Sequence, residues 1–154
     1  KTSGEELCKM YYNLYGLKTI IFRYFNVYGP REPLKGPYAP LVGIFLRQYK
    51  AGEPLTVVGD GEQRRDFTHI DDVVDANIKA AEVEHDTAFG KVINVGTGKN
   101  YSVNDIAKMV GGTIINVPER KGEARETLAS NILLKQWLDC SPKNRIENYI
   151  NGNR

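Results

Sequence analysis

Two adjacent arginines near the middle of the chain are the side chains best suited to binding a charged ligand. Arg64 and Arg65 follow a turn, Gly59 to Gly61, whose glycines can adopt positive φ. Because successive side chains of a strand face opposite ways, only one of the two arginines can point into a cleft. An arginine in that position presents a rigid fork of donors that suits phosphate or carboxylate. The alternative is a solvated charge cluster in which an arginine pairs with Asp66.

Strands on both sides of this turn must position the arginines. Leu55 to Val58 is a β-type run, and Asp66 to Ile70 alternates in the manner of a second strand. Asp71 and Asp72 are then expected to cap a helix over 73–83. Within the second strand, His69 is interpreted as a hydrogen-bonded structural residue rather than a base.

The N-terminal segment has the pattern of half a βαβ unit. Ser3 and Glu6 have capping-box spacing at the start of a helix that Gly16 ends. Lys18 to Phe25 is a nearly continuous apolar run, which is typical of a strand buried on both faces of a parallel sheet. Such a strand needs neighbours that the chain does not obviously supply. Asn26 to Pro30 leaves its carboxyl end, where open α/β sheets bind ligands.

The rest of the chain alternates helical and strand patterns. A Pro- and Gly-rich loop over 31–40 precedes a helix over 41–49, and Ser102 is expected to cap another helix. A charged loop over 118–126 carries Arg120, Lys121 and Arg125. The remaining expected elements are strands over 91–95 and 113–117 and helices over 103–110 and 131–138.

Composition excludes several classes of protein. The 154 residues suffice for one domain with a core, and 41% hydrophobic and 26% charged residues are typical of soluble globular proteins. A net charge of +2 is too small to indicate a nucleic-acid partner, and no apolar run is long enough to span a membrane. Cys8 and Cys140 have no pairing or metal-ligand spacing, and His69 and His85 form no metal constellation. We therefore expect no bound metal and a reducing, cytoplasmic setting.

The first residue indicates how the chain relates to a larger protein. The sequence begins at Lys1, without a methionine and at the onset of a helix. We expect it to be a piece of a longer polypeptide.

Five segments, in this order, resemble the C-terminal part of the extended short-chain dehydrogenase/reductase family, specifically its NAD-dependent sugar-nucleotide epimerases and dehydratases. UDP-glucose 4-epimerase is the best-known example of that group. Each segment alone is a weak signal, but five at compatible spacing make a strong one. They are Lys1–Glu5, Arg23–Pro30, Gly59–Phe67 with His69–Asp72, Asn94–Gly98, and Gly122–Arg125.

The resemblance implies an α/β fold in two parts. Residues 1–30 would be the last helix and strand of a doubly wound cofactor domain, and residues 31–154 the nucleotide-sugar-binding lobe. The expected cofactor is NAD in the full-length protein, the expected ligand a nucleotide-diphosphate sugar, and the expected assembly a homo-oligomer. A buried strand without neighbours, over 18–25, is a further reason to expect copies to associate through a strand edge.

The resemblance also assigns cofactor contacts. Lys1 occupies the place of the lysine in the family's Tyr-x-x-x-Lys pair, which binds the nicotinamide ribose and lowers the pKa of the tyrosine. That tyrosine would precede Lys1 by four residues, and the glycine-rich pyrophosphate turn is also absent from this sequence. Tyr24 and Phe25 match positions beside the nicotinamide.

Substrate contacts follow in the same way. Asn26, Arg65 and Arg125 match the positions that hold the substrate diphosphate, while the Tyr38 segment and Val58 match those that enclose the base. For Asn26 a strand-end turn is the alternative interpretation, and for Arg125 it is surface pairing with a nearby glutamate.

The predicted function is therefore that of a fragment of an NAD-dependent nucleotide-sugar epimerase, which alone neither binds NAD tightly nor catalyses. The alternatives are a fragment of a 4,6-dehydratase or decarboxylase, and a non-catalytic module that binds nucleotide sugars or proteins.

Overall fold

The computed structural model describes residues 2–34, 36 and 39–154. Within these residues the helices are α1 (Thr2–Tyr15), α2 (Leu41–Lys50), α3 (Ile70–Glu82), α4 (Val103–Val110), α5 (Ile132–Leu138) and α6 (Ile146–Asn153), with a 3-10 turn at Asp86–Ala88. The strands are β1 (Ile20–Tyr24), β2 (Asn26–Tyr28), β3 (Leu55–Val58), β4 (Arg64–His69), β5 (Lys91–Val95), β6 (Asn100–Ser102) and β7 (Ile114–Val117). No helix in the described part of the chain is both long and apolar enough to cross a membrane.

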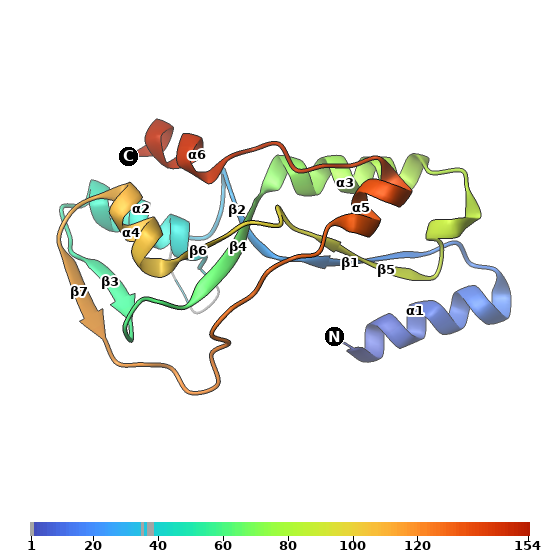
Figure 1. Ribbon diagram of the computed structural model, residues 1–154, viewed down its shortest axis with the longest axis horizontal. Coiled ribbons are helices and arrows are strands. Elements are labelled where there is room, and N and C mark those ends of the chain that lie inside the picture. The colour runs from blue at the N-terminus through green and yellow to red at the C-terminus, as the bar shows by residue number, and fades with distance from the viewer. Residues whose placement is uncertain (1, 35, 37–38) are drawn as a thin grey trace.

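The apolar strand β1 finds a partner inside the chain. It pairs in parallel with β5, in a register that runs from Ile20 opposite Lys91 to Tyr24 opposite Val95. Helices α3 and α5 lie on one face of this pair and α1 lies on the other (Figure 1). The expectation that the chain supplies no neighbour for this strand is therefore wrong. The pairing spans about seventy residues of sequence, and no local pattern can specify such a contact.

A second group of elements surrounds its own core. The strands β2, β4 and β6 form one sheet, and β3 pairs in parallel with β7. Helices α2, α4 and α6 gather at this end of the molecule (Figure 1). The largest buried side chains of this core are Tyr28, Phe45, Leu55, Ile106 and Ile150.

The chain passes from the first group to the second at a single residue. The Phe25 N–H donates to the Val95 carbonyl (3.1 Å), so Phe25 still belongs to the β1–β5 pair. The next residue, Asn26, starts β2 and lies opposite Phe67 of β4. Asn26 therefore stands at the carboxyl end of β1, at the boundary between the two groups.

The start of α3 differs from the prediction. The helix begins at Ile70, and the His69 ring accepts a hydrogen bond from the Asp71 N–H (3.2 Å) as its N-cap. Asp72 is buried and accepts bonds from the Lys143 and Asn144 backbone instead. The interpretation of His69 as a hydrogen-bonded structural residue is confirmed. The predicted aspartate cap is wrong, because Asp72 instead binds the backbone at Lys143 and Asn144.

The buried carboxylate of Asp66 joins three segments. Asp66 has no exposed surface, and it accepts hydrogen bonds from the Thr97 N–H (2.8 Å), the Gly98 N–H (2.9 Å) and the Ala129 N–H (3.2 Å). The Thr97 hydroxyl adds a fourth bond (2.7 Å). Asp66 thus fixes the turn after β5 and the segment before α5 against β4, and the proposed surface pairing with an arginine does not occur.

Replacing Asp66 should destabilise the fold strongly. We expect Asp66→Ala to lower the free energy of unfolding by about 3 to 5 kcal/mol, because several buried N–H groups lose their acceptor. Urea denaturation followed by circular dichroism measures this change. The control is Asp71→Asn, at an exposed side chain of the neighbouring helix, which should change stability by less than about 1 kcal/mol. Equal effects of the two substitutions would contradict the role given to Asp66.

Candidate functional site

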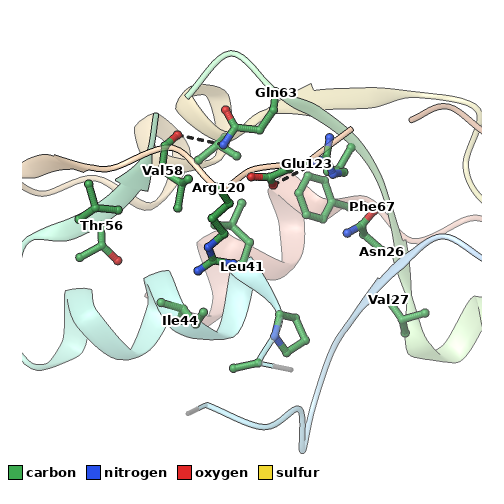
Figure 2. Close-up of a pocket in the computed structure, with 15 residues that line it drawn as sticks. Asn26, Val27, Leu41, Ile44, Thr56, Val58, Gln63, Phe67, Arg120 and Glu123 are labelled. Atoms are coloured by element: carbon green, nitrogen blue, oxygen red, sulfur yellow. Dashed lines mark hydrogen bonds and ion pairs between the residues drawn. The ribbon is translucent and has the colours of Figure 1, made fainter. Parts of the chain in front are cut away.

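A cavity of about 420 Å³ lies between α2, the ends of β3 and β4, and the loop that follows β7 (Figure 2). This volume lies within the usual range for small-molecule sites. The cavity is lined by Asn26, Val27, Ala39, Pro40, Leu41, Ile44, Thr56, Val58, Gln63, Arg65, Phe67, Val103, Val117, Arg120 and Glu123.

The apolar side of the cavity comes from three elements, one helix and two paired strands, whose positions are fixed by packing. Leu41 and Ile44 project from α2, and Val58 and Val117 are register partners at the carboxyl ends of β3 and β7. The Gln63 side chain donates to the Val58 carbonyl (3.0 Å), so the turn after β3 is tied to the wall. The result is a preformed apolar surface that could hold a flat ring.

Arg65 supplies one guanidinium to the lining. The Arg65 side chain is 13% exposed, and its guanidinium donates to the Arg64 carbonyl (2.8 Å) and to the Glu123 carboxylate (3.1 Å). Arg64 turns the other way and donates to Asn100 (2.9 Å). Strand alternation therefore separates the two arginines as the sequence predicts, with Arg65 directed at the cavity.

A second guanidinium comes from Arg120, which the sequence did not single out. The loop after β7 runs across the cavity mouth, and Arg120 points across the space toward Leu41 (Figure 2). Among the described residues, no carboxylate lies within ion-pairing distance of Arg120. Its charge is thus available to an anion. Arg120 could have been found from its place just after β7, whose carboxyl end lies beside that of β3. The pairing of β3 with β7 is not visible in the sequence, however.

Asn26 belongs to two adjoining spaces. It lines the cavity, and it also lines an open hollow of about 370 Å³ together with Arg23, Tyr24, Phe25 and Thr127. The Tyr24 hydroxyl donates to Asn77 (3.1 Å), which holds the ring at the edge of the hollow. An amide at this junction can contact a ligand that extends from one space into the other.

Arg125 does not line the cavity. Its guanidinium donates to both carboxylate oxygens of Asp60 (2.8 Å each), and both side chains are more than half exposed. This bidentate contact holds the pKa of Asp60 down at about 2. The backbone explains why the Arg125 side chain points toward the turn that contains Asp60. The Arg64 N–H donates to the Arg125 carbonyl and the Thr127 N–H donates to the Arg64 carbonyl, so this segment runs along the edge of β4. The structure does not bring Arg125 together with Arg65 and Asn26.

Of the other five predicted site residues, the structure describes three. Val58 lines the cavity, and Tyr24 and Phe25 line the hollow. Lys1 and Tyr38 lie outside the described residues, although the neighbouring Ala39 and Pro40 contribute to the cavity wall. Across the described ranges, no group of three or more His, Cys, Asp or Glu side chains is arranged to hold a metal ion.

Comparison with known proteins identifies the family to which the chain belongs. Residues 1–96 match the NAD dependent epimerase/dehydratase family. The chain belongs to this family. The matched residues contain β2, which begins at Asn26, and β4, which contains Arg65.

Individual relatives are similar to this chain in sequence and in fold. A UDP-N-acetyl-alpha-D-glucosaminuronate decarboxylase of Bacillus cytotoxicus is 39% identical over 127 residues, which are 79% of this chain and 38% of the relative. The solved UDP-glucose 4-epimerase of Thermotoga maritima with UDP-glucose superposes with a TM-score of 0.91 at 34% identity, over 99% of this chain and 50% of that one. The solved UDP-glucuronic acid 4-epimerase of Bacillus cereus, in complex with UDP-glucuronic acid and NAD, gives 0.88 at 31% identity, over 99% and 49%.

Two statements follow from these comparisons. The fold is the α/β fold of the family's epimerases, as the sequence predicts. The chain spans about half the length of these solved relatives and 38% of the decarboxylase.

A carboxyl group in a second, smaller cavity, which α2 also borders, has an unusual environment. Glu32 lies against the first turn of α2, where a Cβ on Gly43 would come within 2.9 Å of the Glu32 carboxyl carbon. Its Oε2 atom is buried without a hydrogen-bond partner among the described residues. Burial raises the pKa of Glu32 to about 7, and the backbone N–H groups of Gly29 and Gly43 offset only part of that effect.

This pKa predicts how stability depends on pH. Glu32 binds its proton more tightly in the folded chain than in the unfolded chain, where its pKa is near 4.5. The Glu32 contribution to the free energy of unfolding should therefore fall as pH rises from about 4.5 to about 7, and then stay constant. Urea denaturation between these pH values should show a flatter profile for Glu32→Gln than for the wild type. Glu84→Gln, at an exposed site, should keep the wild-type slope, and an unchanged slope in Glu32→Gln would refute the assignment.

Proposed function

We propose that this chain supplies the nucleotide-diphosphate-sugar-binding part of an NAD-dependent nucleotide-sugar epimerase. The observation that carries the proposal is the convergence of Arg65, Arg120 and Asn26 on one cavity with an apolar wall. The solved relatives with UDP-sugars and the family membership support it.

The two guanidiniums fit a diphosphate. Each can donate paired N–H groups to phosphate oxygens, and Glu123 orients Arg65 without neutralising Arg120. The apolar wall formed by Leu41, Ile44 and Val58 would receive the base. Contacts at the diphosphate and the base are remote from the reacting carbon, so they supply binding energy that holds the sugar in place.

Asn26 would mark the boundary between recognition and chemistry. A ligand whose diphosphate lies at Arg65 and Arg120 would pass Asn26 and place its sugar in the hollow beside Tyr24 and Phe25. The carboxamide can donate to a phosphate oxygen or to a sugar hydroxyl there.

The residues of this chain fit one side of an NAD site. Tyr24 and Phe25 border the open hollow, from which their rings would contact a nicotinamide. The sequence contains no Gly-x-Gly-x-x-Gly turn to hold the pyrophosphate of the cofactor. When bound, NAD supplies reversible hydride transfer, and this chain would contribute the ring contacts and the position of the sugar.

The decarboxylase is the second candidate. It is favoured by the 39% identity to the Bacillus cytotoxicus relative. Both reactions use a nucleotide sugar, so the same cavity would serve either.

Binding of UDP tests the proposed site. We expect titration calorimetry of the chain with UDP to show binding that Arg65→Ala and Arg120→Ala each weaken about 10- to 100-fold, since each loses charge-assisted hydrogen bonds. Arg125→Ala distinguishes the two diphosphate assignments, because the structure predicts a smaller loss there than at Arg120. The charge control is Lys108→Ala, which removes an exposed cation of α4 that does not line the cavity.

Three outcomes would count against the site. UDP binding that none of the arginine substitutions weakens would place the ligand elsewhere, and no binding at millimolar UDP would remove the proposal. A larger loss in Arg125→Ala than in Arg120→Ala would favour the assignment made from the family resemblance.

The chain alone should lack activity. The proposed contacts at Tyr24 and Phe25 would hold one side of NAD, so we expect no turnover of UDP-galactose by the 154 residues in a coupled assay with added NAD. A solved full-length relative, such as the Thermotoga maritima enzyme, serves as the positive control. Turnover that depends on chain concentration would contradict this expectation.

A further inference from the structure

Helix α2 separates two cavities. Leu41 and Ile44 border the larger one, which the proposed function uses. A smaller cavity of about 210 Å³ lies along another side of the same helix, between α2 and α6, and we call it the α2–α6 groove. The two helices line it with residues that recur every three or four positions, so each helix contributes one face. They are Gly43, Leu46, Arg47, Lys50, Tyr149 and Asn153.

The groove is rich in positive charge. Arg31, Arg47 and Lys50 line it, and we call them the groove cations. Arg47 donates to Glu53 (2.9 Å), which does not line the groove. Within the described part of the chain, no carboxylate lies within ion-pairing distance of Arg31 or Lys50. Two of the three positive charges are therefore uncompensated, and together they attract an anion.

Two polar atoms of the groove residues lack partners. Arg47 Nε and Glu32 Oε2 are both buried without a hydrogen-bond partner among the described residues. A buried polar group costs free energy until a partner satisfies it, and native structures leave few such groups. A small rotation of either side chain would bring these atoms to an occupant of the groove, which would then satisfy them.

Glu32 determines the charge that the occupant can carry. Burial raises the pKa of its carboxyl to about 7, so below that pH the group is neutral and its O–H can donate to an anion. The groups around it are the N–H groups of Gly29 and Gly43, the Tyr149 side chain of α6, and the groove cations. Arginine, lysine and tyrosine side chains do not ordinarily titrate near neutral pH, so Glu32 is the group whose charge changes there.

A phosphate group fits this set of donors. Its oxygens accept charge-assisted hydrogen bonds from guanidinium and ammonium groups, and its double negative charge matches the two uncompensated groove cations. Leu34, Leu46 and Tyr149 add apolar surface that could contact a carbon skeleton.

We propose that the α2–α6 groove is a second ligand site, which binds a phosphate group between the groove cations with the Glu32 carboxyl as a further hydrogen-bond donor. The site uses a different side of α2 from the larger cavity, so it does not depend on the proposed function.

Sulfate binding tests the proposal, because sulfate has the shape and charge of a phosphate dianion and does not titrate near neutral pH. In an amide NMR titration at about pH 6, sulfate should shift the Gly43 and Asn153 signals with a dissociation constant on the order of 1 mM. Lys50→Ala should raise this constant about fivefold or more, since a charge-assisted contact is lost. The matched control is Lys135→Ala, which removes an exposed cation from the last turn of α5 and should leave the constant unchanged.

The pH dependence of sulfate binding tests the Glu32 donor. The wild-type affinity should fall about tenfold between about pH 6 and about pH 8, because only the protonated form of a group with a pKa of about 7 donates to the anion. Glu32→Gln carries an amide that donates at both pH values, so its affinity should stay constant. Glu84→Gln, at an exposed site, should keep the wild-type fall. Circular dichroism checks that every variant folds.

The source of the phosphate group can be distinguished with two further probes. Inorganic phosphate and glycerol phosphate should both bind, and tighter binding of the ester would identify a phosphate ester rather than free phosphate as the ligand.

Four results would overturn the proposal. The first is no saturable shift at Gly43 by about 50 mM sulfate, and the second is sulfate shifts confined to the larger cavity, as at Val58. The third is an equal effect of Lys50→Ala and Lys135→Ala. The fourth is a wild-type affinity that does not change with pH, which would remove Glu32 from the site.

Discussion

The arrangement of the chain depends on one buried carboxylate. Asp66 lies in the middle of β4, and its oxygens accept four hydrogen bonds from Thr97, Gly98 and Ala129. A buried carboxylate is tolerated only when its hydrogen-bonding capacity is satisfied, so Asp66 holds the three segments together. Arg65 is the residue directly before it. The network that stabilises the fold therefore also fixes the strand register that directs Arg65 to the cavity.

The direction of the backbone decides which arginine side chains face the cavity. Three arginines lie close in sequence or space, yet their environments differ. Arg125 is held by Asp60, Arg65 is held by Glu123 at the cavity wall, and Arg120 has no ion pair among the described residues. A guanidinium that faces a cavity can donate paired N–H groups to an anion there, and both Arg65 and Arg120 line the cavity.

The boundary between the two groups of elements is where the ligand spaces meet. β1 and β2 are separated by Phe25 alone, and this short connection places Asn26 at the carboxyl end of one sheet and beside the first residues of the other. Open α/β folds bind ligands at such edges because strand ends and loops converge there without filling the space. Helix α1 lies on the far face of the β1–β5 pair, where little of this chain covers it (Figure 1).

The sequence by itself determined most local elements, because hydrophobic periodicity, glycine turns and caps such as Ser102 act over a few residues. It also determined that one of Arg64 and Arg65 faces inward, since strand alternation allows nothing else. Only the tertiary structure decided that β5 is the partner of β1, that Asp72 binds the segment at Lys143 instead of capping α3, and that Arg120 rather than Arg125 lines the cavity. Each of these contacts joins residues far apart in the chain, and the energy that selects among them comes from packing and burial of the whole fold, which no short stretch of sequence contains.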